Sequence, residues 1–168
     1  MSLRLVESPL GPLALACDRQ GAIRYLGFAD HEPRTRLLAG ILAEPDLGRD
    51  PALLDPAARQ LEAWFTGRRR AFDLPLAPRG TPFQRRVWEA LQAIPYGATA
   101  TYASLAAALG GPALARAVGA ANGANPISII IPCHRLLGSD GALTGFAGGL
   151  ERKRLLLAWE ASGAVPGK

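Results

Sequence analysis

Three side chains with chemical potential stand on consecutive positions late in the chain. They are Cys133, His134 and Arg135, which follow Pro132 in the run IIIPCHR. A cysteine is a nucleophile only as a thiolate, and neighbouring histidine and arginine groups favour that form. We therefore predict Cys133 as the nucleophile and His134 as its base. The chemistry that this arrangement indicates is covalent, either that of an enzyme or that of a covalent acceptor.

A histidine base needs a partner on its other ring nitrogen, most often a carboxylate. The carboxylates downstream of His134 are Asp140, Glu151 and Glu160. Asp140 lies in a glycine turn and Glu151 at a solvated helix start. Glu160 ends an apolar helical stretch, where the helix dipole disfavours a carboxylate that has no other role. We predict Glu160 as the partner of His134.

The geometry between thiol and base depends on the local backbone. In an extended segment, Cys133 and His134 would point to opposite faces. A turn after Pro132 would let a bridging water connect them. The sequence leaves open whether His134 reaches Cys133 directly or through water.

Other cysteine chemistries find little support. The only further cysteine and histidine are Cys17 and His31, and neither a CxxC nor an HxxxH motif occurs. We therefore expect no metal, no disulfide and no thioredoxin-like activity. Cys17, in the apolar stretch LALAC, is predicted as a buried structural thiol. No glycine-rich phosphate loop with lysine is present, and we expect no cofactor.

The overall composition narrows the partners. The chain has 168 residues, of which 49% are hydrophobic. It contains no apolar run of about 18 residues and no leader-like start, so we predict no membrane partner and a cytoplasmic location. Residues 81–168 carry 8 basic and 4 acidic side chains, whereas residues 1–80 carry 11 and 10. A basic C-terminal half suits a polyanion, although charge alone does not decide for DNA.

The N-terminal half is predicted to be a small α/β domain. Three strand-like stretches separated by glycine and proline turns lie within residues 3–29 and indicate an antiparallel sheet. Helices are expected over 32–45 and 51–65, the second with Asp55 as a candidate N-cap. The proline-rich stretch 73–80 is predicted as a linker. The expected domains are therefore 1–78 and 79–168.

The C-terminal half is predicted to be mostly helical. Thr81 and Pro82 begin one helix, as N-cap and first residue. The final helix spans about 150–161, and we expect its Arg152–Arg154 face to be solvated. The apolar run 127–131, just before the nucleophile, is predicted as a buried strand.

Two short alanine-rich helices are expected over 102–109 and 113–121, separated by Gly110, Gly111 and Pro112. This pattern indicates a helix-turn-helix. On the second helix only Arg116 has a long side chain, and the small residues around it would let the backbone approach another surface closely. These residues leave DNA binding and tight helix packing equally open. An activated thiol beside such a motif indicates an acceptor cysteine acting on DNA.

With these features, the chain resembles the O6-alkylguanine-DNA alkyltransferases, also called methylated-DNA–protein-cysteine methyltransferases. The resemblance covers residues 80–160, in order and with family-like spacing. Its motifs are GTPFQRRVWEAL, IPYGATATYASLA, ARAVGAANGANP, IIIPCHRLLGSDGALTGFAGGL and LLAWE. Together they are highly specific, whereas residues 1–78 resemble the family's small α/β domain more weakly.

The resemblance implies a role for each residue of the reaction centre. Cys133 resembles the thiol that takes the alkyl group from guanine O6 in one irreversible step. His134 resembles its base acting through water, and Glu160 resembles the carboxylate that orients the imidazole. Asn125 resembles the asparagine that braces the turn before the active-site segment. Tyr102 resembles the phenol that hydrogen-bonds the flipped base.

The resemblance also implies how double-stranded DNA binds. The alanine-rich helix would enter the minor groove through Ala115 and Ala117, and Arg116 would fill the gap that the flipped guanine leaves. Gln84 and Ser139 would contact the DNA backbone. In the base pocket, the resemblance implies contacts from Leu136 and from the amide of Ala147. Some relatives have serine at the position of Ala147, and that hydroxyl is missing here.

The function expected from the resemblance is single-turnover repair of O6-alkylguanine by a monomer without an obligate protein partner. O4-methylthymine is a further candidate substrate. The alternative is a non-catalytic protein that binds alkyl lesions, which would lack the cysteine; Cys133 argues against it. A regulator switched by a methylated cysteine would need a further domain, for which this chain has no room.

Overall fold

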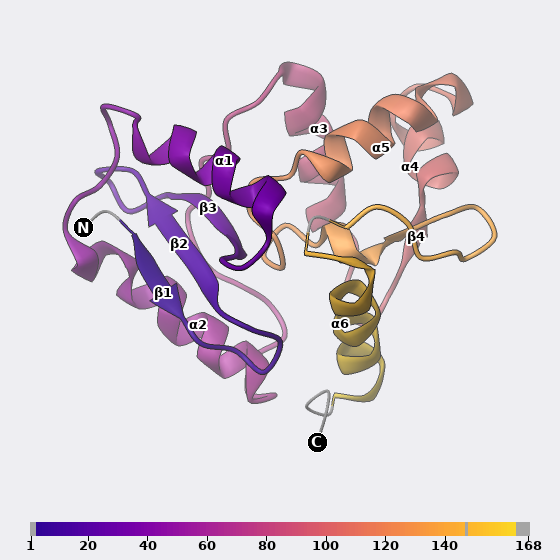
Figure 1. Ribbon diagram of the computed structural model, residues 1–168. Helices are drawn as coiled ribbons and strands as arrows, with labels where there is room; N and C mark the ends of the chain where they lie inside the picture. Colours follow the sequence, from indigo (N-terminus) through magenta and orange to yellow (C-terminus); the bar gives the residue numbers. More distant parts are fainter. Residues whose placement is uncertain (1–2, 147, 164–168) are drawn as a thin grey trace.

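The N-terminal half folds around a three-stranded antiparallel sheet in the order β1-β2-β3 (Figure 1). The computed structural model describes residues 3–146 and 148–163. The strands are β1 (Arg4–Val6), β2 (Leu13–Cys17) and β3 (Ile23–Phe28). The predicted antiparallel sheet is confirmed.

Helices α1 (Glu32–Leu42) and α2 (Asp55–Phe65) cover opposite faces of this sheet (Figure 1). Alternate β2 side chains serve the two faces, since successive residues of a strand point in opposite directions. Leu13 and Leu15 join the core that includes α2, whereas Ala14 and Ala16 join the smaller core beneath α1. Covered on both faces, β2 is buried along its whole length.

The predicted bounds of these two helices need correction. The first ends at Leu42, three residues before the predicted end. The predicted helix over 51–65 consists of a 3-10 turn, η1 (Pro51–Leu54), followed by α2. Asp55 is the first residue of α2 and not its N-cap, and it is Asp50 that caps, accepting a hydrogen bond from Ala52 N at 3.0 Å. The proline at position 56 lacks an N–H group, so one continuous helical ladder cannot form across it.

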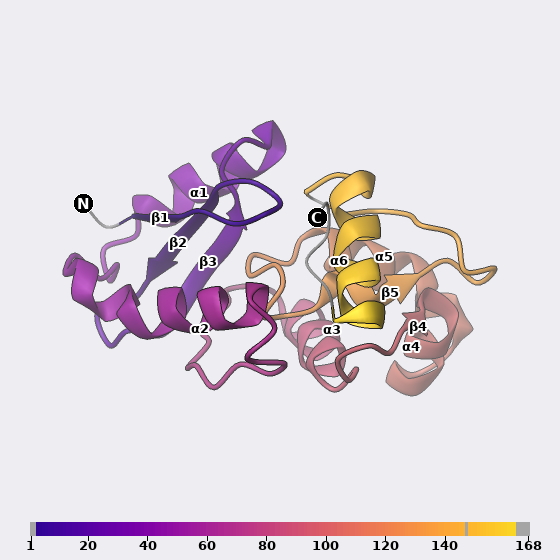
Figure 2. The same cartoon turned by 90° about the horizontal axis from the view of Figure 1, so that it is seen from below.

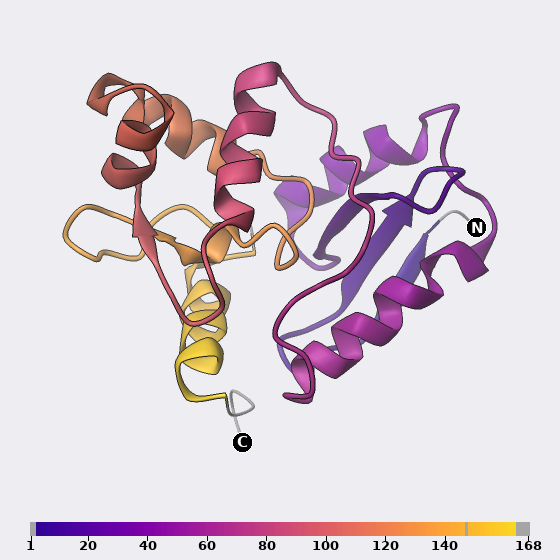
Figure 3. The same cartoon turned by 180° about the vertical axis from the view of Figure 1, so that it is seen from behind.

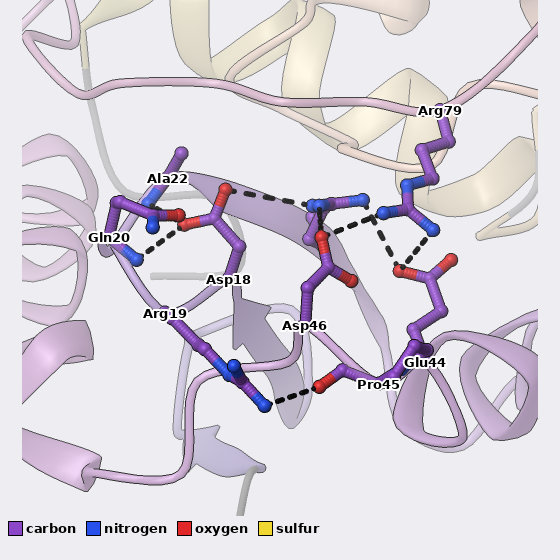
Figure 4. Close-up of polar contacts among 9 residues, drawn as sticks. Asp18, Arg19, Gln20, Ala22, Glu44, Pro45, Asp46 and Arg79 are labelled. Carbon is purple, nitrogen blue, oxygen red and sulfur yellow. Dashed lines mark hydrogen bonds and ion pairs between the residues drawn. The ribbon is translucent and has the colours of Figure 1, made fainter.

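The segment between α2 and the next helix runs between the two halves, on the side that faces the viewer in Figure 3. It is fastened to β3, because Ile23 N donates to Pro75 O and Ala77 N donates to Ile23 O, both at 2.8 Å. Arg79 at its end forms ion pairs with Glu44 and Asp46, as Figure 4 shows. The hydrophobic core also continues from the sheet into the C-terminal half. The division into two domains at residue 78 stays a prediction.

The C-terminal half is mostly helical, as predicted. Its elements are α3 (Pro82–Gln92), β4 (Ala100–Thr101), α4 (Tyr102–Leu109), η2 (Pro112–Leu114), α5 (Ala115–Gly123), η3 (Cys133–Arg135), β5 (Leu136–Leu137) and α6 (Leu150–Ser162). Thr81 caps α3 as expected, and β4 pairs with β5 in parallel. Figure 2 shows α6 in front of this half. Within the described residues, every helix is too short or too polar to cross a membrane.

The two alanine-rich helices lie against each other, but their boundary differs from the prediction. Pro112 begins the 3-10 turn η2, which includes Ala113, and α5 starts only at Ala115 and runs to Gly123. A proline-led tight turn therefore occupies the start of the predicted helix. The assignment as a helix-turn-helix stays a prediction.

The predicted strand over 127–131 is wrong. Only Ile127 forms a bridge, to Leu26 of β3. A γ-turn follows, in which Ile130 N donates to Ser128 O at 2.8 Å and the central Ile129 has a φ of 72°. Positive φ in a β-branched residue is strained and rare. A run of isoleucines resembles a strand, yet these hydrogen bonds coil the segment before Cys133.

Candidate active site

The backbone turns sharply where the nucleophile was predicted. Cys133 N donates to Ile131 O at 2.8 Å, and Pro132 between them has φ −81° and ψ 66°, the geometry of an inverse γ-turn. Cys133 then begins the 3-10 turn η3, which packs against α6. The thiol residue is only 2% exposed. This coiled backbone, and not an extended segment, places Cys133 and His134.

The predicted pairing of His134 with Glu160 is present. His134 Nε2 lies 2.8 Å from Glu160 Oε2, and both side chains are buried. Arg135 donates two hydrogen bonds to the same carboxylate, from Nε to Oε1 at 2.8 Å and from Nη2 to Oε2 at 2.7 Å. Its Nη1 donates to the carbonyl oxygen of Ile94 at 2.6 Å. The glutamate therefore has a histidine and a two-pronged arginine partner, the second of which the sequence did not predict.

These contacts determine the charges in the network. Burial alone would raise the pKa of Glu160, but the hydrogen bonds and charges of His134 and Arg135 bring it down to about 2. Burial lowers the pKa of His134, so its imidazole is neutral at pH 7. An ionised carboxylate only accepts hydrogen bonds, so the neutral imidazole carries its proton on Nε2. Nδ1 is then the atom with the lone pair.

The Nδ1 atom is placed to act as a base. It is buried and has no hydrogen-bond partner within residues 3–146 and 148–163. A buried polar atom without a partner is uncommon and calls for an explanation, such as a bound water or a catalytic role. Among the described residues, no hydrogen bond joins His134 to Cys133. This arrangement favours contact through a bridging water over direct contact.

Asn125 organises the segment that leads to the thiol. Its side-chain amide donates to Ile127 O at 3.2 Å and Ile131 O at 2.9 Å, and its Oδ1 accepts from Ile127 N at 3.0 Å. It is fully buried. These three bonds hold the turns at 127–131 together, as the expected bracing role requires.

Arg34 of α1 approaches the same segment from the N-terminal half. Its guanidinium donates to the carbonyl oxygen of Asn125, and to Ser128 Oγ at 3.3 Å. The residue is buried although it carries a charge. Nothing in the sequence around Arg34 indicates this role, because the contact spans 91 positions along the chain.

The side of α6 that carries Lys153 differs from the prediction. The solvated face predicted for Arg152–Arg154 holds only for Arg154, since Lys153 is 0% exposed and Arg152 pairs with Asp30. A signal was available: Lys153 lies seven residues before Glu160, on the same helical face, which the buried carboxylate should have marked as inward.

Neighbouring groups shift the pKa of the Cys133 thiol in opposite directions. Burial raises the pKa of Cys133, while the nearby amide of Asn125 and the charges of Arg34 and Lys153 act to lower it. The net shift is upward, so the resting form is a thiol. A base is therefore needed at the moment of reaction.

Tyr102, the predicted base-contacting phenol, lies at the start of α4 against the loop after β5. Its hydroxyl donates to Thr144 O at 3.3 Å and accepts from Thr144 Oγ1 at 3.2 Å. A side chain on Gly145 would come within 3.2 Å of the Tyr102 hydroxyl. Any side chain at this position would therefore crowd the phenol. Leu136 is buried in β5 nearby, and Ala147 lies outside the described residues.

The predicted DNA-contacting residues lie away from this network. Arg116 and Ala117 are exposed on α5, Ala115 is half-buried, and Arg116 has no hydrogen bond or ion pair within the described part of the chain. Ser139 is exposed in the turn at 138–141. Gln84 has a structural role, because its Oε1 accepts from Thr81 N at 2.9 Å in the capping box of α3. Its contact with DNA stays a prediction.

No cluster of three or more potential metal ligands occurs in residues 3–146 and 148–163.

Comparison with known proteins identifies the family of this site. Two family models match, both of 6-O-methylguanine DNA methyltransferase: the ribonuclease-like domain over residues 1–78 and the DNA binding domain over residues 82–162. A methylated-DNA–protein-cysteine methyltransferase of Methanosarcina barkeri is 49% identical, with 93% of this chain and 94% of that protein covered. Its Salmonella typhimurium counterpart is 46% identical, with 94% and 96% covered. The crystal structure of Mycobacterium tuberculosis OGT in complex with DNA superposes with a TM-score of 0.82 at 44% identity, covering 96% of this chain and 94% of that one.

Proposed function

The chain belongs to the 6-O-methylguanine DNA methyltransferase family, and on this premise we propose that Cys133 is the residue that takes the alkyl group from O6-alkylguanine in DNA. The relatives are named for transfer from methylated DNA to a protein cysteine, and one neighbour is a complex with DNA. The protein is thus a DNA-binding methyltransferase whose acceptor is its own thiol.

One observation carries the choice of Cys133, namely the buried network beside it. Burial keeps His134 neutral, and Glu160, itself bound by Arg135, orients the imidazole with its proton on Nε2 and its lone pair on Nδ1. A thiol whose resting pKa is raised by burial needs such a base in the transition state. Cys17 has no comparable surroundings, since it packs in the sheet core.

The proposed reaction balances without a cofactor. The Cys133 thiol gives its proton to His134 Nδ1 through a bridging water, and the sulfur attacks the alkyl carbon. A sulfur–carbon bond forms as the carbon–O6 bond breaks, and the electron pair stays on guanine. Guanine regains one proton, assisted by the Tyr102 hydroxyl as donor, and His134 returns to neutral. The thioether is permanent, so each chain reacts once.

DNA must deliver the base in an extrahelical position, because the alkyl carbon on O6 cannot meet a buried thiol from within the stack. We propose that α5 enters the minor groove with Ala115 and Ala117 against the DNA. The exposed Arg116 then occupies the space that the guanine leaves. The proposal also includes DNA backbone contacts by Gln84 and Ser139 and base contacts by Leu136 and Ala147. It further includes a monomeric state and a cytoplasmic location.

The test uses duplex DNA with a radiolabelled O6-methyl group. We expect label on the protein that saturates at one per chain, is lost in Cys133→Ala and persists in Cys17→Ala, the matched control. Tight lesion binding without any label would instead support the non-catalytic lesion-binding alternative, which the presence of Cys133 disfavours. The same assay with O4-methylthymine decides whether that base is also a substrate.

A further inference from the structure

The buried ammonium of Lys153 has no role in the proton and alkyl transfer steps proposed for Cys133. Lys153 is fully buried on α6. Within the described residues no carboxylate pairs with it, and a buried charge without compensation is costly. Its partners are two backbone carbonyl oxygens, Leu136 O at 2.5 Å and Thr144 O at 2.6 Å. Short charge-assisted bonds such as these are strong.

The two carbonyl groups belong to two different segments of the proposed site. Leu136 directly follows the turn that carries Cys133 and His134. Thr144 lies in the loop after β5, beside Tyr102 and Gly145. Lys153 therefore joins the nucleophile segment to the loop that faces the phenol. Removal of the ammonium would leave both carbonyl groups without that donor and the loop without this attachment.

Thr144 O has a second donor, the Tyr102 hydroxyl. The Tyr102 hydroxyl lies 3.3 Å from Thr144 O and 3.2 Å from Thr144 Oγ1, and both distances are long for hydroxyl groups. The bond from Lys153 to Thr144 O is short. A phenol that turns to hydrogen-bond a substrate base must leave Thr144 O. With Lys153 in place, that oxygen keeps its stronger partner, so the cost of an unsatisfied carbonyl does not arise.

We propose that Lys153 is a positioning residue for the base pocket, which joins Leu136 to Thr144 and frees Tyr102 to bind the substrate base. This inference rests on the proposed function, in which Tyr102 contacts the base. The nearby charge of Lys153 also acts to lower the pKa of Cys133, a second and separate contribution to the reaction.

The experiment compares Lys153→Met and Lys153→Arg with wild type in single-turnover transfer from O6-methylguanine duplex. We expect Lys153→Met to lower the rate at saturating DNA at least tenfold, with the half-saturating DNA concentration within twofold of wild type. Lys153→Arg, which keeps charge and donors, should recover at least a third of the wild-type rate. Arg154→Met removes one charge from the exposed side of the same helix and should react as wild type.

A double-mutant comparison tests the link to Tyr102. We expect Tyr102→Phe to lower the rate by a smaller factor in the Lys153→Met background than in wild type, because the freed phenol is then already lost. Independent factors that multiply would contradict the proposal. So would a folded Lys153→Met that reacts at the wild-type rate. If Lys153→Met does not fold, Lys153→Gln takes its place, and a folded Lys153→Gln at the wild-type rate overturns the proposal equally. A wild-type protein that takes up no label would instead refute the proposed function.

Discussion

The two cysteines are almost equally buried, but their polar surroundings differ. Cys17 is 1% exposed and Cys133 is 2% exposed. Burial raises the pKa of both thiols, and Asp18 raises that of Cys17 further. Around Cys133, an amide and two cations act in the opposite direction, and a histidine with a free lone pair stands next in the chain. Burial makes a thiol inert, and the polar network beside it supplies the reactivity.

Among changes to the surroundings of Cys133, we expect Arg135→Met to have the largest effect on stability. It removes two hydrogen bonds from a buried carboxylate, and breaking a buried ion pair on one side costs about 3–5 kcal/mol of stability. Urea unfolding measures the loss, and transfer should slow because Glu160 is no longer fixed in the position from which it orients His134. Arg154→Met, whose partner Glu151 is exposed, is the control and should unfold as wild type. Equal stabilities of the two variants would refute the network's role.

The next largest effect is a loss of folding stability in acid. The pKa of Glu160 is about 2 in the folded protein against an ordinary value of 4.5, so the native state binds fewer protons than the unfolded state. Stability from this group is complete above pH 4.5 and is lost as the pH falls towards 2, by about 3 kcal/mol in total. Urea unfolding between these pH values measures it.

Glu160→Gln is the matched variant for this acid dependence. Its stability should change less across the same window, because glutamine does not titrate. Parallel pH curves for the variant and wild type would show that Glu160 is not held ionised by the network.

A smaller effect is expected from Arg34→Met. The variant loses the bonds to Asn125 O and Ser128 Oγ, and hydrogen bonds from a charged group contribute about 1.5–3 kcal/mol. The pKa of Cys133 should rise, which the pH dependence of iodoacetamide labelling reports. Arg36→Met, an exposed position on the same helix, is the control. An unchanged thiol titration in Arg34→Met would show that the N-terminal half does not tune the site.

The smallest effect belongs to Cys17→Ala. Loss of a small buried group should cost about 1 kcal/mol of stability and leave the transfer rate unchanged. Thermal unfolding and single-turnover kinetics measure the two quantities. A reduced rate would mean that the two cysteines are less different than their surroundings indicate.

The sequence predicted the parts of the site that lie close along the chain or repeat a helical pattern. Cys133 and His134 were adjacent, and Glu160 stood out because a carboxylate at an apolar helix end has an unfavourable position. The antiparallel sheet followed from glycine and proline turns between apolar stretches. These signals are local, so one sequence contains them.

The remainder depends on contacts that no local pattern encodes. Arg34 reaches Asn125 across the molecule, and Lys153 between two arginines looked like part of a solvated face. The run 127–131 was misjudged because its hydrophobicity and β-branching match a strand, while Asn125 and the γ-turns that coil it act through side-chain and backbone hydrogen bonds. Only the tertiary structure reveals that Arg135 donates two hydrogen bonds to Glu160.

The central claim is that surroundings, and not burial, make one of two buried cysteines the acceptor. Peptide mass spectrometry of wild-type protein after reaction with O6-methylguanine duplex tests it most directly. We expect one methyl group on the peptide that contains Cys133 and none on the peptide that contains Cys17. Methyl on Cys17, or repaired DNA with an unmodified Cys133, would contradict the account.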